Sequence, residues 1–245
     1  LNNFRGLNQC WTKDTDNSTS LTTNAGFKKR QDFIIQQPNT KGNFSFAVPL
    51  NHILGFADDY DKVLYGSRQT LTLVRQHDSD AIFKKSTVAA GKITLDKVYW
   101  NLPQIEPNLE ENLRLHELIE SKVSFPVAFR SRHCESINVP QSSTFTWNLR
   151  QSAETAEFVI IGFQTDRDED QSKNAALYDH CDVNNIYVTL NNKRFPREDI
   201  ISDFDEHDFS DLFHAAVSFK ETYHQLDSLM CNPSLNPKEY KDLYP

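Results

Sequence analysis

The sequence predicts an all-β protein that forms an antiparallel sandwich, with a few short helices in its loops. Three observations lead to this prediction: several segments alternate apolar and polar residues, long polar stretches separate them, and helical periodicity is confined to short runs. Aromatic residues make up 11% of the 245 residues, whereas there are only seven Gly and ten Pro. This composition is typical of a globular chain with a real core.

Strands are predicted wherever the apolar residues recur with a period of two. The predicted strands cover residues 44–49, 70–75, 92–99, 144–150, 157–164 and 185–190. The segment EFVIIGFQ (157–164) is apolar on both faces, which predicts a buried central strand. Asn191-Asn192 suits a turn, because Asn tolerates left-handed backbone conformations. Several strands joined by long polar loops favour a jelly roll.

Helical signals are few. In DFSDLFHAAVSFKETY (208–223), apolar residues recur every three or four positions behind a possible cap at Asp208, which predicts an amphipathic helix. Asn236-Pro237 predicts a second, short helix, since it combines a capping residue with proline in the first turn. Residues 108–121 are ambiguous. Residues 1–43 are polar and predict a long loop around one strand at Phe33-Ile34-Ile35.

The formal charge of −8 and the pI near 5.5 argue against a dedicated nucleic-acid binder. Two basic clusters, Lys28-Lys29-Arg30 and Lys84-Lys85, are short, and each is interpreted as a solvated loop, with a local phosphate contact as the less favoured reading. The cysteines are far apart and form no CxxC pair, which favours a reducing compartment. No apolar run reaches the ~20 residues of a membrane span.

The densest group of carboxylates follows the apolar segment 157–164. Asp166, Asp168 and Asp170 have the first three spacings of a calcium loop, yet Gln171 stands at position six and Leu177 at position twelve. We therefore interpret this acidic group as a solvated loop.

A second acidic group, Asp58-Asp59-Tyr60-Asp61, could suggest glycoside hydrolysis, but no partner carboxylate can be located. A solvated turn is the simpler interpretation.

Two His-Cys pairs, His133-Cys134 and His180-Cys181, could in principle supply four ligands for zinc. Adjacent residues of a strand point to opposite faces, so each pair is expected to divide between core and solvent. The sequence also has no Gly-x-Ser-x-Gly elbow, phosphate loop or dinucleotide fingerprint. We predict no catalytic residues, no metal site and no cofactor, and hence a protein that is not an enzyme.

The order of four segments resembles that of double jelly-roll major capsid proteins: VPLNHILGFADDYDKVLYGSRQTLTLVR (48–75), GKITLDKVYWNLPQIEP (91–107), FVIIGFQTDRDEDQSKN (158–174) and NNIYVTLNNKRFP (184–196). The chain is most similar to the versions of Polinton (Maverick) and adintovirus-type DNA elements, and more loosely to those of nucleocytoplasmic large DNA viruses. The resemblance implies the C-terminal part of a first jelly roll over residues 1–90. Residues 91–245 would be a second, incomplete jelly roll, with flanking sequence missing.

The resemblance also implies a function. Copies of the chain would form homotrimeric capsomers that contact neighbouring capsomers and minor capsid or penton proteins in an icosahedral shell. The protein would be located in the virion, without binding a specific nucleic acid. The alternative is a carbohydrate-binding, lectin-like jelly roll, in which Trp11, Trp100 and Trp147 could stack on sugars. Trp147 alternates with Phe145 and Leu149 and is interpreted as a core residue.

Overall fold

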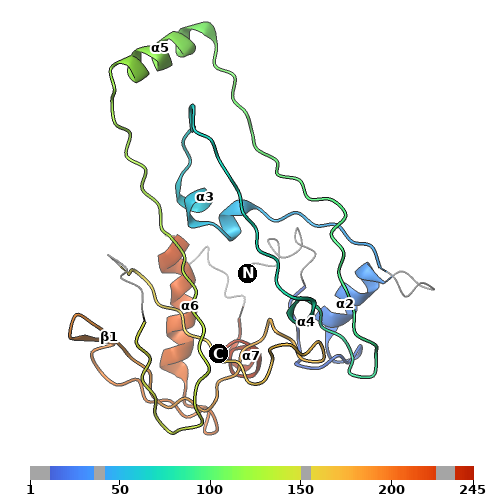
Figure 1. The fold of residues 1–245 in the computed structure, drawn as a ribbon. Coiled ribbons are helices and arrows are strands. Elements are labelled where there is room, and N and C mark those ends of the chain that lie inside the picture. The colour runs from blue at the N-terminus through green and yellow to red at the C-terminus, as the bar shows by residue number, and fades with distance from the viewer. Residues whose placement is uncertain (1–11, 36–41, 150–155, 225–234) are drawn as a thin grey trace. The chain divides into compact units, whose positions relative to one another are not determined.

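The computed structural model describes residues 12–35, 42–149, 156–224 and 235–245 (Figure 1). The chain divides into two compact units. Unit 1 contains Leu1–Phe46, Val74–Ile93 and Glu157–Pro245, and unit 2 contains Ala47–Leu73 and Thr94–Ala156. The division into jelly rolls at residues 1–90 and 91–245 stays a prediction.

Helices are the commonest regular elements of the described chain. Unit 1 contains α2 (Ala25–Ile34), α4 (Asp78–Ala81), α6 (Ser210–His224) and α7 (Pro237–Leu243). Unit 2 contains the 3-10 helix η1 (Leu50–His52), α3 (Gly55–Asp59) and α5 (Leu109–Glu120). None of the helices among the described residues has the length and apolar character that crossing a membrane requires.

The described residues contain a single two-stranded sheet, formed by β1 (Val188–Leu190) and β2 (Lys193–Phe195). The strand predicted at 185–190 is therefore confirmed over residues 188–190, whereas residues 185–187 are not part of it. The segments 44–49, 70–75, 92–99, 144–149 and 157–164 are not strands, although Phe163 forms an isolated bridge with Asp179, and residue 150 lies outside the described residues. An alternating pattern specifies which face of a strand is apolar, but not which segment pairs with it. The all-β prediction is thus not confirmed by the elements present.

The β1–β2 hairpin forms around the turn that the sequence predicts at Asn191-Asn192. Asn191 and Asn192 both have positive φ, 49° and 62°, as a tight two-residue hairpin turn requires. Val188 pairs with Phe195, and Leu190 pairs with Lys193. The guanidinium of Arg194 lies 4.1 Å from the centre of the Tyr187 ring, which adds a cation–π contact beside the ladder.

Two of the predicted helices are confirmed. Helix α6 covers most of the amphipathic stretch 208–223. Helix α7 starts at Pro237, and Asn236 caps it: the Asn236 side chain accepts a hydrogen bond from the Glu239 N–H (2.8 Å), while the Glu239 carboxylate accepts one from the Asn236 N–H (3.3 Å). The ambiguous segment 108–121 forms α5 behind the Asn108 cap.

Helix α2 corrects the prediction for the N-terminal region. Asn24 caps it, because its side-chain oxygen accepts a hydrogen bond from the Phe27 N–H at 3.0 Å. Phe33 and Ile34, predicted to lie in a strand, form the last turn of this helix. The expectation of a strand was wrong because three apolar residues without alternation cannot distinguish a strand from the end of a helix.

The hydrophobic core of unit 1 lies where α7 meets the start of α6. Phe204, Phe209 and Tyr240 are buried and form a chain of ring contacts, with centroids 5.2 Å apart for Phe204–Phe209 and 5.9 Å apart for Phe209–Tyr240. Leu243 of α7 is buried too, and Leu177 is fully buried. These residues all lie in the C-terminal third of the chain.

Unit 2 is organised around α3 and residues 129–132. The Phe56 ring stacks on Tyr60 and meets the edge of Phe129, each with centroids 5.2 Å apart. A Cβ atom at Gly55 would lie 1.7 Å from the Arg130 carbonyl oxygen, so only glycine allows this close approach. Helix α5 is joined to the rest of unit 2 by long irregular segments (Figure 1).

The segment 157–162 is not the buried central strand that its composition predicts. Ile160 is 76% exposed, and Val159 and Ile161 are exposed as well. Phe158 packs on a helix, with its ring centroid 5.3 Å from that of Phe219 and 5.8 Å from that of Tyr223 of α6. The prediction was wrong because apolar composition makes burial favourable, but burial also requires a partner surface.

Candidate functional site

The acidic residues after the apolar segment do not converge. Asp166, Asp168 and Glu169 are exposed, and Asp166 lies 3.3 Å from the Lys173 ammonium. The Asp170 carboxylate accepts hydrogen bonds from the Ser172 N–H (2.8 Å) and hydroxyl (2.6 Å). These hydrogen bonds lower the pKa of Asp170. Asp166 and Asp170 therefore have separate local partners, and the acidic residues do not form a shared centre.

Gln171, which stands where a calcium loop requires glycine, ties the acidic loop (residues 164–179) to residues 78–91. Its side-chain amide donates to the carbonyls of Asp78 (3.0 Å) and Gly91 (2.9 Å), and its side-chain oxygen accepts from the Gly91 N–H (2.8 Å). Its own carbonyl accepts from the Lys84 N–H at 2.8 Å. One side chain thus replaces the hydrogen bonds that a neighbouring strand would supply.

Arg167 is the buried charge of the acidic loop, with 6% of its surface exposed. Its guanidinium forms two hydrogen bonds with the Asp179 carboxylate, one of them Nε–Oδ2 at 3.1 Å, and donates to the Asn174 carbonyl at 3.2 Å. Burial alone would raise the pKa of Asp179, but the hydrogen bonds from Arg167 and from the Thr165 N–H outweigh it and lower this pKa. The Asp179 carboxylate is therefore held in its charged form.

An open pocket of about 280 Å³ lies beside this ion pair. It is lined by Asn17, Thr165, Arg167, Ser172, Lys173 and Asp179. The two cations of the pocket already face carboxylates, Arg167 towards Asp179 and Lys173 towards Asp166. A ligand would have to compete with these ion pairs, so the pocket is better suited to holding the loop than to chemistry.

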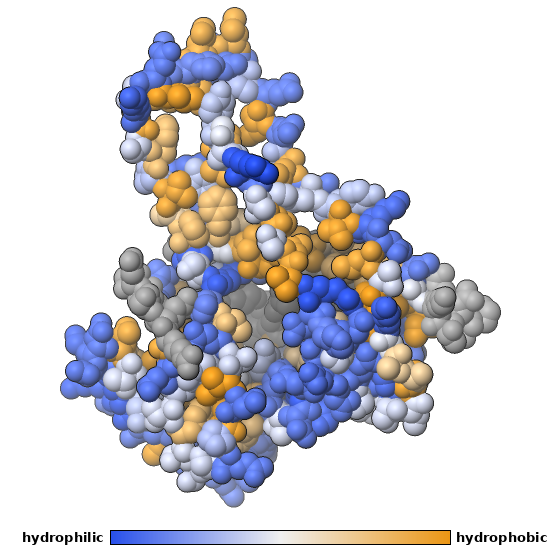
Figure 2. Space-filling model, viewed as in Figure 1, coloured by the Kyte–Doolittle hydropathy of each residue, from blue (hydrophilic) through white to orange (hydrophobic). Residues whose placement is uncertain are grey.

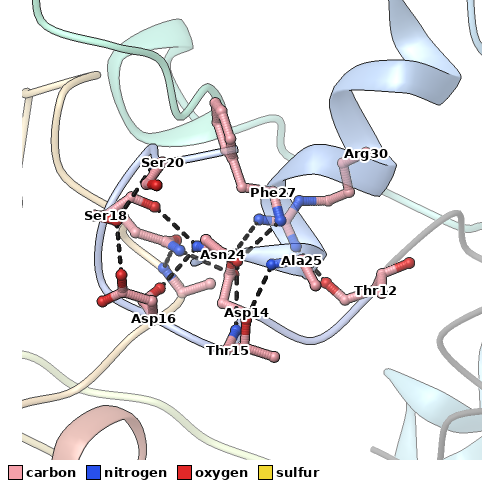
Figure 3. Close-up of polar contacts among 12 residues, drawn as sticks. Thr12, Asp14, Thr15, Asp16, Ser18, Ser20, Asn24, Ala25, Phe27 and Arg30 are labelled. Atoms are coloured by element: carbon pink, nitrogen blue, oxygen red, sulfur yellow. Dashed lines mark hydrogen bonds and ion pairs between the residues drawn. The ribbon is translucent and has the colours of Figure 1, made fainter. Parts of the chain in front are cut away.

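A second buried polar network joins the N-terminal segment to the same loop (Figure 3). Asp14 and Asn24 are fully buried. The Asp14 carboxylate accepts hydrogen bonds from Asn24 (2.9 Å), Arg30 (2.6 Å) and Asn174 (3.0 Å). The Asn24 amide also donates to the carbonyls of Asp16 (2.7 Å) and Ser18 (2.9 Å). This network was not predicted from the sequence, and the signal that could have indicated part of it is Asn24, a residue type that often caps helices.

Helix α7 is fastened to the same N-terminal segment. The Lys13 ammonium lies 2.5 Å from the Glu239 carboxylate and 5.4 Å from the centre of the Tyr244 ring. Burial, followed by the nearby charge of Asp14, raises the pKa of Tyr244 to about 12. The Tyr178 N–H donates to the Leu243 carbonyl at 3.0 Å. Polar contacts therefore join the acidic loop, the N-terminal segment and α7.

In unit 2 the acidic group Asp58-Asp59-Tyr60-Asp61 is not simply a solvated turn. Asp59 forms an ion pair with Arg130 at 2.5 Å, and Asp58 lies 3.3 Å from Arg132. Hydrogen bonds from the Arg130 side chain and N–H lower the pKa of Asp59 to about 2. Asp61 is exposed, as predicted. Two of these carboxylates thus clamp residues 129–132 to α3.

The two His-Cys pairs lie in different units. The His133 Nε2 atom is 3.3 Å from the Glu135 carboxylate. His133 and Cys134 are both exposed, so this pair does not divide between core and solvent as expected. His180 stacks on Phe204 with centroids 4.5 Å apart, whereas Cys181 is exposed, so this pair divides between packed and solvated positions as expected. No group of three or more potential ligands suited to a metal occurs among the described residues.

The largest unassigned feature is a set of apolar segments without backbone partners. Residues 94–107, 123–129 and 157–162 make no backbone–backbone hydrogen bond within the described part of the chain. Their apolar side chains are exposed, with 76% for Tyr99 and 63% for Phe125. Figure 2 shows hydrophobic residues gathered over the segments of unit 2 around α3 and α5. Monomeric proteins rarely leave this much apolar side-chain surface exposed, so these segments need an explanation.

The comparison with known families decides what kind of protein carries this surface. The model of the double jelly roll-like domain family matches residues 8–242. The chain belongs to this family. Double jelly roll-like domains are of the kind found in viral capsid proteins. No curated protein and no solved structure matches the chain.

Membership of the double jelly roll-like domain family agrees with the period-two segments of the sequence. Such a segment becomes a strand only when its backbone groups pair with neighbours. The tryptophans considered for sugar stacking differ in position: Trp100 is 39% exposed, Trp147 is half-buried, and Trp11 lies outside the described residues.

Proposed function

We propose that this chain is a structural shell protein whose copies form trimeric capsomers of an icosahedral capsid. The closest kind would be the major capsid proteins of Polinton (Maverick) and adintovirus-type elements, with those of nucleocytoplasmic large DNA viruses as a looser parallel. The protein would be located in the virion and would contact neighbouring capsomers and minor capsid or penton proteins. It would not be an enzyme.

One observation carries this proposal: segments with the alternating or apolar pattern of strands expose their apolar side chains and form no backbone pairing with the rest of the described chain. Residues 157–162 show it most clearly, because they are apolar on both faces and Ile160 is 76% exposed. An unpaired edge with apolar side chains is a template for pairing with another chain. Association between copies would cover these segments.

The polar groups also support a structural role. The buried or half-buried charges Asp14, Asp59 and Arg167 are each bound by an oppositely charged side chain of the same unit. A catalytic group needs a site for the reacting atom within hydrogen-bond reach. In these three cases another side chain of the protein occupies that position.

The proposal is tested by comparing wild type with an Ile160→Asp variant by light scattering and electron microscopy. Because Ile160 is exposed, the charge does not enter the core, and the free energy of unfolding of the separated chain should change by less than about 0.5 kcal/mol. The same charge would face apolar groups of a neighbouring copy. We expect trimers and shells for wild type and mainly monomers for the variant.

Ser143→Asp is the matched control, because it adds the same charge at an exposed position in unit 2. It should leave assembly unchanged. A wild-type chain that stays monomeric at high concentration contradicts the proposal. An Ile160→Asp variant that assembles normally removes residues 157–162 from the interface.

The lectin-like alternative is favoured by one observation, the exposed ring of Trp100. It predicts binding to a glycan array that is lost in a Trp100→Ala variant. Binding of glycans by a chain that does not form trimers would replace the capsid proposal with this one.

A further inference from the structure

The tripeptide Phe-Lys-Lys occurs twice in the chain, at residues 27–29 and 83–85. The structure brings the two copies together. The rings of Phe27 and Phe83 meet edge to face, with centroids 5.3 Å apart and an interplanar angle of 73°. Phe27 leaves α2 away from the polar network around Asn24 (Figure 3). Two basic clusters that are short and separate in the sequence therefore lie beside one aromatic contact in unit 1.

Three lysines of these repeats have no partner in the described part of the chain. Lys28, Lys29 and Lys85 are exposed and form no hydrogen bond or ion pair through their side chains there. Lys84 differs, since its ammonium donates to the Val88 carbonyl at 2.8 Å and thereby holds the following turn. We call Lys28, Lys29 and Lys85 the lysine patch.

Two charged groups next to the lysine patch, those of Arg30 and Asp170, are bound by other groups, and a third, Asp32, carries a single negative charge against the three of the lysines. Arg30, which follows the first repeat, is bound to Asp14. Asp170, whose pKa is lowered by its hydrogen bonds to Ser172 and by Lys173 and Lys84, lies near the second repeat and faces Ser172. Asp32 of α2 is exposed and forms no ion pair with either lysine of its helix. The patch therefore keeps its positive charge although the whole chain carries −8.

We propose that the lysine patch binds the phosphate backbone of nucleic acid without reading its sequence. Lysine is a flexible, hydrated point charge that can neutralise phosphates, and each neutralised phosphate releases counterions. The two Phe rings are turned towards each other, so they are not free to stack on bases as in a single-strand binding groove. Contacts to phosphates alone position a protein on nucleic acid without specifying bases. This site is independent of whether the chain forms a capsid.

The test measures the anisotropy of a fluorescent duplex of random sequence at several salt concentrations. Three phosphate contacts predict a slope of log K against log salt of about −2.7, which corresponds to a loss of affinity of about 40-fold between about 50 and 200 mM salt. In the variant Lys28→Gln, Lys29→Gln, Lys85→Gln the slope should fall to near zero, because all three charges are removed. The three corresponding Lys→Arg substitutions should preserve it.

The matched control is the variant Lys62→Gln, Lys97→Gln, Lys122→Gln, which removes three exposed lysines from unit 2. It changes the net charge equally and should leave the slope unchanged. The proposal is overturned if wild type does not bind the duplex at the lowest salt concentration. It is equally overturned if the slope of log K against log salt falls by the same amount in the lysine-patch variant and in the unit 2 control. It is also overturned if polyglutamate of equal charge competes as well as DNA, since the patch would then fit an acidic protein surface.

Discussion

Residues 157–162 and the acidic loop 164–179 are consecutive in the sequence, yet they behave in opposite ways. The first segment is almost entirely apolar and makes no backbone–backbone hydrogen bond within the described chain. The second is rich in carboxylates, and its groups bind the N-terminal segment, residues 78–91 and α7. In this protein the polar segment, and not the apolar one, is held by hydrogen bonds to other parts of the chain.

The difference follows from the kind of partner that each segment needs. A carboxylate or an amide needs only a few single hydrogen-bonding groups, and separate neighbouring segments supply them, as Asn174 and Arg30 do for Asp14. A strand needs a whole neighbouring edge with matching register. Unit 1 provides the first kind of partner for the acidic loop, whereas its described residues provide no paired edge for residues 157–162.

The largest expected effect comes from removing a buried carboxylate that holds the acidic loop to the N-terminal segment. In an Asp14→Ala variant, Asn24, Arg30 and Asn174 lose the buried carboxylate that accepts their hydrogen bonds. Removing one partner of a buried ion pair typically costs about 3–5 kcal/mol. Chemical denaturation should show a loss of this size. Asp32→Ala, an exposed position on α2, should change the free energy of unfolding by less than about 0.5 kcal/mol.

A Gln171→Ala variant should have an intermediate effect. It removes two donors and one acceptor that serve the backbone of Asp78 and Gly91, and it leaves those groups without their partner. We expect a loss of about 1–3 kcal/mol in the free energy of unfolding. Hydrogen exchange should quicken at the Gly91 amide. Equal stability of wild type and variant would show that the acidic loop does not depend on this side chain.

The ion pair between Asp59 and Arg130 in unit 2 should make the free energy of unfolding depend on pH. The pKa of Asp59 is lowered from 3.8 to about 2 in the folded chain, so the unfolded chain binds the proton more tightly. The stabilisation is therefore complete above pH 3.8 and is lost as the pH falls towards 2. The difference in stability between wild type and Asp59→Asn should narrow over this range. A difference that stays constant would mean that Arg130 does not act through the charge of Asp59.

The smallest expected effect belongs to Asp168, which is exposed and forms no side-chain hydrogen bond or ion pair within the described residues. Asp168→Asn should change the free energy of unfolding by less than about 0.5 kcal/mol. Asp170→Asn should cost more, because the Asp170 carboxylate accepts two hydrogen bonds from Ser172. If the order of the two variants is reversed, the exposed carboxylate has a structural role that its surroundings do not show.

The sequence by itself determined the features that depend on neighbouring residues. The Asn236-Pro237 start of α7, the amphipathic α6 and the Asn191-Asn192 turn were predicted correctly, because capping, helical periodicity and positive φ are properties of a few consecutive residues. The order of the segments also indicated the double jelly roll family, which the match over residues 8–242 shows.

Only the tertiary structure decided which distant residues are partners. The binding of Asp14 to Asn174, the bonds of Gln171 to Gly91 and the meeting of the two Phe-Lys-Lys repeats join segments that no local pattern connects. The same reason explains the error at Ile160. Its apolar side chain makes burial favourable. Whether it is buried depends on an apolar surface from another segment, which residues 157–162 do not themselves contain.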